Sequence, residues 1–223
     1  MLFKARLRRL IEILKPVKIK IVMLQDFAPY SVVTLSTEKI PSSNVINQTI
    51  ETTEDAIALL TSLSAPPKLV QHHRLVVEAA QELLQGMQQL FPRFTFNSQL
   101  VLKGSALHDA GKILHQNEIT GVGNDHEQDG ETMLLSLGVS PEIAKFCRTH
   151  ARWSSQDATV EDWLVALADT LWKGCRKEKL EASLIAAIAQ QTGKDVWDIF
   201  ILADSLFEEI ADRGSERLSR SVL

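Results

Sequence analysis

Apolar residues recur every three or four positions along most of this chain from Thr52 onward, which is the period of one helix face. The clearest case is the segment 68–90, whose buried face is predicted to carry Leu69, Val76, Ala79, Ala80, Leu83 and Met87. The same period, together with residues that start or stop helices, predicts further helices at about 53–64, 98–108, 127–137, 141–150, 160–172, 177–191 and 195–211. Thr53 is the expected N-cap of the first of these. Short connections between the helices indicate an all-α fold, an irregular multi-helix bundle.

The first 50 residues follow a different pattern. Residues 18–24 and 30–35 are rich in β-branched and aromatic side chains, which is typical of short strands. Residues 41–44 read Pro-Ser-Ser-Asn, a composition that favours a turn or linker. We therefore expect a small N-terminal appendage with short strands at residues 1–50, followed by one helical domain at residues 51–223.

Composition narrows the class of protein. With 45% hydrophobic and 23% charged residues, the chain of 223 residues is ordinary for a globular protein. No apolar run approaches the roughly 20 residues that a membrane helix requires. The two cysteines, Cys147 and Cys175, form no CxxC motif and are expected to be reduced thiols. These features favour a cytoplasmic protein without a membrane span.

Charge is distributed unevenly along the chain. Residues 1–20 carry a net charge of +6, and the remainder carries −10. A basic amphipathic arm of this kind either lies in solvent or contacts a membrane or a nucleic acid. The acidic remainder argues against a nucleic-acid-binding face, so we expect no nucleic-acid partner.

The candidate chemistry begins at residues 107–112, Leu-His-Asp-Ala-Gly-Lys. His108 and Asp109 are metal-ligand types in adjacent positions at the end of an apolar helix. Because adjacent helical side chains diverge by about 100°, both can reach one ion only near a helix end. Gly111 permits the backbone to turn away there, and Lys112 supplies a cation where a phosphate would lie.

Two other predicted helices carry polar residues among apolar neighbours. His72 and His73 each have apolar residues three and four positions away, so at least one should point inward, and a buried imidazole needs a partner. Asp169 is the only charged residue between Asp162 and Lys173. Buried carboxylates are paired or bind cations, so Asp169 is either a metal ligand or the ion-pair partner of Lys173.

The order His, His-Asp, Asp in these contexts resembles the HD superfamily of metal-dependent phosphohydrolases. The resemblance covers about residues 65–175 and rests on the segments HHRLVVEAA, ALHDAGK and LVALAD. It implies that one ion is held by His72, His108, Asp109 and Asp169. His72 fits the family pattern better because Val76 and Val77 follow it, and His73 remains the alternative first ligand.

The same resemblance extends to a subset of the family that holds two ions. It implies that His126 and His150 bind the second ion, with Asp109 bridging the pair. The alternative is that these two histidines only support the ligands or lie at the surface. After Lys173 no motif is recognisable, and the amphipathic C-terminal helices at about 177–212 either pack over this metal-site core or form a homodimer interface.

Imidazoles and carboxylates without a thiolate favour Mn, Fe, Co, Ni or Zn over Mg. The resemblance implies a phosphomonoesterase or phosphodiesterase in which one or two ions activate a water. The expected substrate is a small phosphorylated compound, a nucleotide. The expected catalytic residues are Asp109 and Lys112, and the residues expected to bind substrate phosphates are Lys112, Arg148, Lys173 and Arg176. The alternative function is a non-catalytic regulatory HD module that binds a metal or a nucleotide.

Overall fold

The computed structural model describes residues 49–222, and within this range every regular element is a helix, with no strand. The prediction of an all-α bundle is therefore confirmed. The short strands expected at residues 18–24 and 30–35 lie outside the described residues. No helix within the described range is long and apolar enough to cross a lipid bilayer.

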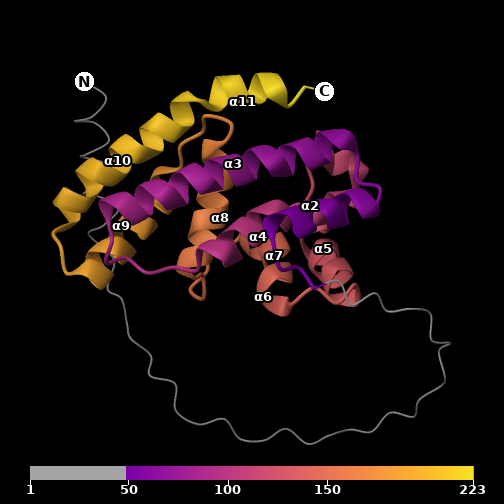
Figure 1. Ribbon diagram of the computed structural model, residues 1–223, viewed down its shortest axis with the longest axis horizontal. Coiled ribbons are helices and arrows are strands. Elements are labelled where there is room, and N and C mark those ends of the chain that lie inside the picture. The colour runs from indigo at the N-terminus through magenta and orange to yellow at the C-terminus, as the bar shows by residue number, and fades with distance from the viewer. Residues whose placement is uncertain (1–48, 223) are drawn as a thin grey trace, which may run out of the picture.

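The helices follow one another with short connections (Figure 1). In chain order they are α2 (Thr53–Ser62), α3 (Pro67–Leu90), α4 (Ser98–Leu107), η1 (Ala110–Ile113), η2 (Gln116–Ile119), α5 (Asp125–Ser136), α6 (Pro141–Ala144), α7 (Phe146–Thr149), α8 (Val160–Leu171), α9 (Glu178–Thr192), α10 (Val196–Asp212) and α11 (Gly214–Arg220). The predicted segments match these helices with three differences. Thr52, and not Thr53, caps α2, in a capping box with Asp55. The segment 141–150 is divided at Lys145 into α6 and α7, and η1, η2 and α11 were not predicted.

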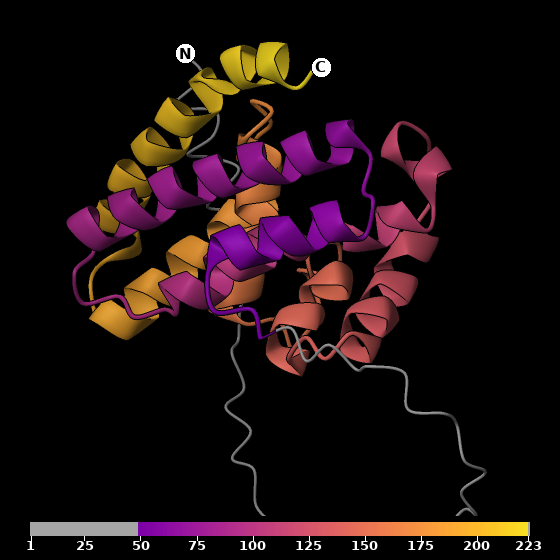
Figure 2. The ribbon, with the colours of Figure 1, turned by 45° about the vertical axis from the view of Figure 1, so that its right-hand side comes forward.

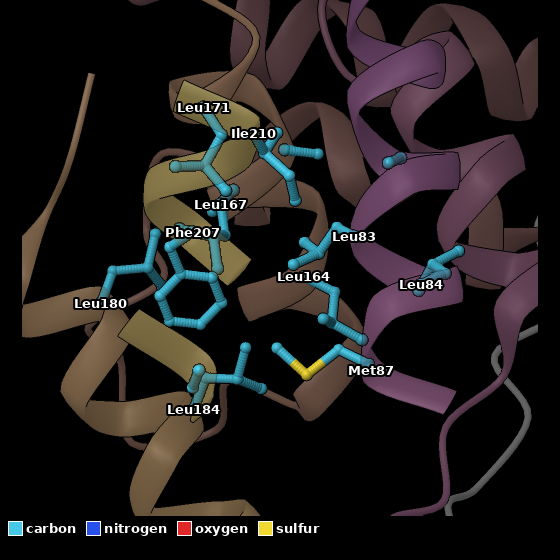
Figure 3. Close-up of a cluster of buried hydrophobic side chains, with 14 of the residues drawn as sticks. Leu83, Leu84, Met87, Leu164, Leu167, Leu171, Leu180, Leu184, Phe207 and Ile210 are labelled. Carbon is cyan, nitrogen blue, oxygen red and sulfur yellow. The ribbon is translucent and has the colours of Figure 1, made fainter. Parts of the chain in front are cut away.

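The core forms where α3, the longest helix, packs against α4, α8 and α10. Figure 3 shows Leu83 and Met87 of α3 facing Leu164 of α8, with Phe207 of α10 to the left of them. All four of these side chains are fully buried. Burial of an apolar side chain of this size stabilises the fold by about 1.5 to 3 kcal/mol, so this contact fixes α3 and α8 relative to each other.

The C-terminal helices cover the bundle. α10 packs over the core, because its buried apolar side chains are Ile199, Phe200, Ala203, Phe207 and Ile210. Packing over the core is one of the two arrangements that the sequence left open for the C-terminal helices. α10 and α11 lie along one side of α3 (Figures 1 and 2). Arg217 of α11 is completely buried and pairs with Glu78 and Glu82 of α3, at 3.1 and 2.6 Å. A buried guanidinium is tolerated only when it is paired in this way, so these contacts hold α11 on α3.

A second polar contact joins α7 to α8. Asp162 closes the capping box of α8 with Thr159, and its other oxygen accepts a hydrogen bond from Thr149 at 2.7 Å. Lys145 lies 3.2 Å from the same carboxylate. Burial raises the pKa of Asp162, but the Thr159 amide, the Thr149 hydroxyl and Lys145 outweigh it, so the pKa is lowered. Asp162 therefore fixes the end of α7, next to His150, against α8.

Replacing Asp162 by alanine is expected to lower the free energy of unfolding by about 2 kcal/mol, because a helix cap and a buried interhelical contact are lost together. For a chain of this size, that corresponds to a melting temperature lower by about 4 to 8 °C. Because the folded-state pKa is depressed, the contribution is full above the ordinary pKa of 3.8 and disappears as pH falls through the folded-state value. The difference between wild type and variant should therefore shrink in acid.

Thermal or urea unfolding at neutral and acidic pH measures this effect. Asp157→Ala is the matched control, because Asp157 is exposed and forms no hydrogen bond or ion pair within residues 49–222. Equal stability changes in the two variants would contradict the role of Asp162.

Candidate metal centre

Three helices bring the first group of expected ligands together. His72 lies on α3, His108 is the C-cap of α4, and Asp169 lies near the end of α8. Asp109 follows His108 directly and begins η1, so its side chain leaves the helix end at a different angle. These are the helices that pack most tightly in the core, and their packing sets the spacing of the four side chains.

The distances within this group are those of side chains that face one point. His72 Nε2 lies 3.3 Å from both His108 Nε2 and Asp109 Oδ2. Asp169 Oδ1 lies 3.5 Å from His108 Nε2 and 3.8 Å from His72 Nε2. Nitrogen and oxygen ligands about 2.0 to 2.2 Å from one ion are themselves roughly 3.0 to 3.5 Å apart. His72, His108 and Asp109 therefore fit a shared divalent ion, and Asp169 lies beside the two histidines.

A second group surrounds the other oxygen of the same carboxylate. His126 Nε2 lies 3.1 Å and His150 Nε2 lies 3.5 Å from Asp109 Oδ1. Within residues 49–222 this buried oxygen accepts no hydrogen bond of acceptable geometry. Two imidazole nitrogens approach this oxygen without forming a hydrogen bond to it. Such an arrangement is expected when the oxygen and the two nitrogens are ligands of a common ion. Asp109 thus presents one oxygen to each group of histidines, and both groups have the composition of a metal site.

Backbone carbonyls orient two of the histidines. His108 Nδ1 lies 2.9 Å from the carbonyl oxygen of Ser105, and His150 Nδ1 lies 2.9 Å from that of Phe146. An Nδ1 that donates to a carbonyl leaves Nε2 with a free lone pair, the form that binds metals. The ring of Trp172 packs edge-on against that of His72, with an angle of 71° between the ring planes and centroids 5.0 Å apart.

Glu118 is a functional candidate that the sequence analysis missed. Its buried carboxylate accepts a hydrogen bond from His126 Nδ1, and it also accepts from the backbone amides of Asp125 and His126. One side chain therefore caps the start of α5 and turns His126 Nε2 toward Asp109. Nothing in the local sequence marks Glu118, because it lies in a polar connection eight residues before the histidine it orients.

Two glycines explain how α5 comes close enough for His126 to reach Asp109. A Cβ on Gly111 would lie 2.0 Å from the carbonyl oxygen of His126, and one on Gly130 would lie 2.8 Å from the amide nitrogen of Gly111. Any side chain at either position would push backbone against backbone. The sequence analysis assigned Gly111 to a turn, but its closer constraint is this contact between η1 and α5.

The electrostatics keep the central carboxylate charged. Burial raises the pKa of Asp109, but His108, His126 and His72 outweigh it and hold the pKa well below its usual range. Burial lowers the pKa of His150 to about 4. His150 is therefore a neutral imidazole and Asp109 a carboxylate at neutral pH, which are the forms that coordinate metals.

A cavity of about 400 Å³ opens onto these side chains. Its lining includes His72, Asp109, His126, His150 and Asp169, together with the lysines Lys68, Lys112 and Lys173. Lys112 Nζ lies 2.6 Å from Asp109 Oδ2, and Lys173 Nζ lies 3.7 Å from Asp169 Oδ2. Asp169 thus meets both sequence interpretations at once, with one oxygen toward the histidines and the other toward Lys173.

Three expected site residues lie elsewhere. His73 is fully buried behind His72, with its Nδ1 3.4 Å from the Ser105 carbonyl oxygen, and does not line the cavity. Arg148 forms a two-pronged contact with Glu131, at 2.8 and 3.2 Å. Arg176 is held by three carboxylates, those of Glu181, Asp204 and Glu208. Neither arginine lines the cavity, and carboxylates pair with both guanidinium groups, so the structure does not bring them together with the other expected site residues.

Comparison with known protein families agrees with this geometry. A family model described as HD domain matches residues 69–172, a segment that begins in α3 and ends at Trp172. The chain contains an HD domain. HD domains are the domains of a superfamily of metal-dependent phosphohydrolases, and the matched segment of this one holds both groups of histidines and carboxylates. No curated protein and no solved structure matches the chain.

Glu118→Gln is expected to weaken binding of the ion held by His126 and His150 by about 10- to 100-fold, because an uncharged amide orients and polarises His126 less well. Calorimetric titration of metal-free protein with Mn²⁺, together with elemental analysis, measures the loss.

The matched control is Asp125→Asn, at the first residue of α5 and seven residues after Glu118. Asp125 is exposed and contacts Glu118 only through its backbone amide, which the substitution keeps. An equal loss in this control would show that the neighbouring group His115, Glu118 and Asp125 holds the ion instead.

Proposed function

We propose that this protein is a metal-dependent phosphohydrolase that cleaves a phosphate ester of a small molecule. The observation that carries the proposal is the position of Asp109 between the two groups of histidines. Its Oδ2 lies 3.3 Å from His72 Nε2 and its Oδ1 lies 3.1 Å from His126 Nε2. A buried carboxylate with an oxygen on each side is suited to bridge two ions a few ångströms apart.

Within this proposal the ligands are His72, His108, Asp109 and Asp169 for one ion and Asp109, His126 and His150 for the other. Bound ions would supply an activated water and neutralise charge on the phosphoryl oxygens. The donor set of imidazoles and carboxylates favours Mn, Fe, Co, Ni or Zn, with Mg less suited.

The residues of the chain have separate roles in this scheme. Asp109 orients the reacting centre, because its low pKa keeps it an ionised carboxylate that both groups of histidines share. Lys112 binds the phosphate that reacts, since its ammonium group already lies at the Asp109 carboxylate on the cavity wall. Burial of Asp109 strengthens its ion pair with Lys112, because charges attract more strongly where water is excluded.

The size of the cavity supports a small substrate. A volume of about 400 Å³ lies in the range of pockets that hold single small molecules. A nucleotide fits this range, and so does a sugar phosphate. A non-catalytic module that binds metal or nucleotide would use the same ligands, so turnover is the property that distinguishes the two functions.

Asp109→Ala is expected to lower kcat for phosphate-ester hydrolysis by more than about 1000-fold, because it removes the carboxylate that both groups of histidines share. The measurement is phosphate release by Mn- or Co-loaded protein over a broad panel of phosphate esters, with Asp109→Asn as a second variant of nearly the same shape. Asp198→Ala on the exposed face of α10 is the control. A wild-type protein that hydrolyses no member of the panel, and whose Asp109 variants lose only ligand affinity, would identify a binding module.

Lys112→Ala is expected to raise KM by about 10- to 100-fold with little change in bound metal, because a charge-assisted hydrogen bond to the phosphate is lost. Steady-state kinetics and elemental analysis of the same samples separate the two effects. Lys194→Ala, in the exposed turn between α9 and α10, is the control. Loss of ions without a change in KM would show that Lys112 serves the metal ligands and not the substrate.

A further inference from the structure

Two lysines extend the cation lining of the cavity outward from the metal ligands. Lys68 stands four residues before His72 on α3, and Lys173 stands four residues after Asp169 at the end of α8. Residues four apart lie on the same helix face, about 6 Å along the axis. Both lysines line the same cavity as the ligands they flank. The backbone of each lysine therefore lies about one helical turn from that of the candidate ligand it flanks.

The charges of these two lysines are largely uncompensated. Within residues 49–222, the ammonium group of Lys68 forms no hydrogen bond or ion pair. Lys173 has a single long contact, 3.7 Å to Asp169, and 38% of its side chain is exposed. Glu127 is the one lining carboxylate outside the candidate ligands, and Arg152 lies 3.3 Å from it. This part of the cavity is consequently electropositive.

A single phosphate does not account for this arrangement. A phosphate ester at the candidate ions is also reached by Lys112, which lies at the Asp109 carboxylate. Lys68 and Lys173 supply two further cations to the lining of the same cavity. Uncompensated lysines that line a cavity attract anions and gain more from a fixed anion than from water.

We propose that the substrate carries a second phosphate group, bound by Lys68 and Lys173 in the same cavity as the phosphate that is hydrolysed. The proposal rests on the proposed phosphohydrolase function and narrows its substrate class to small bisphosphorylated compounds. A ring that bears phosphates on two different carbons, as in a nucleoside or sugar bisphosphate, presents two separate phosphates to one cavity.

Matched pairs of substrates test this specificity. The pairs are adenosine 3′,5′-bisphosphate with adenosine 5′-monophosphate, and fructose 1,6-bisphosphate with fructose 6-phosphate. For the metal-loaded wild type, kcat/KM is expected to be about tenfold or more higher for the bisphosphate of at least one pair. Lys68→Ala and Lys173→Ala should each reduce that ratio about tenfold, and Lys68→Arg should restore most of it. Lys194→Ala is the control.

Binding to the metal-free protein separates this proposal from the proposed function. In EDTA, calorimetric titration with the preferred bisphosphate should show tighter binding than with its monophosphate, and the difference should vanish in the Lys68→Ala, Lys173→Ala double variant. Lysine-dependent binding without hydrolysis in the loaded protein would support the second phosphate site and refute the enzyme. Equal kcat/KM and equal affinity within both pairs, or ratios that the lysine variants leave unchanged, would overturn the proposal.

Discussion

The buried carboxylate of Asp109 is the interaction on which the rest of the structure depends. A buried charge without partners is strongly destabilising, and this one is compensated from every side. Three nitrogens, on His72, His108 and Lys112, face one oxygen at 2.6 to 3.6 Å. His126 and His150 face the other oxygen. These partners come from elements far apart in the chain, so the bundle has to place several helix ends around a single side chain.

The surrounding packing meets that requirement with a small number of close contacts. The backbone of η1 touches that of α5 at Gly111 and Gly130, which brings His126 within reach. Glu118 then fixes the direction of the His126 ring. Asp162 holds the end of α7, and with it His150, against the helix that carries Asp169. The second half of the site therefore depends on contacts that are not themselves ligands.

Arginines and lysines are used differently in this domain. Arg148, Arg176 and Arg217 form multiple short contacts to carboxylates that join helices away from the cavity. The cavity itself is lined by lysines. The planar guanidinium group suits fixed pairing with carboxylates, whereas an ammonium group on a flexible stem remains available to a ligand. Because the arginines pair with carboxylates, fewer of the expected phosphate-binding residues line the cavity than the sequence predicted.

Much of the fold and the core of the candidate site could be predicted from the sequence alone. Helical periodicity located the main helices, because the apolar residues on the buried face of a helix recur every three or four positions. The pair His108-Asp109 and the isolated charge of Asp169 marked the ligands, because such groups are costly in apolar surroundings unless something binds them. The tertiary structure alone decided which of His72 and His73 faces the cavity, and that Arg176 is used for packing while Lys68 lines the cavity. It alone revealed Glu118 beside His126. Each of these depends on which side chains from distant segments meet, and local spacing carries no information about that.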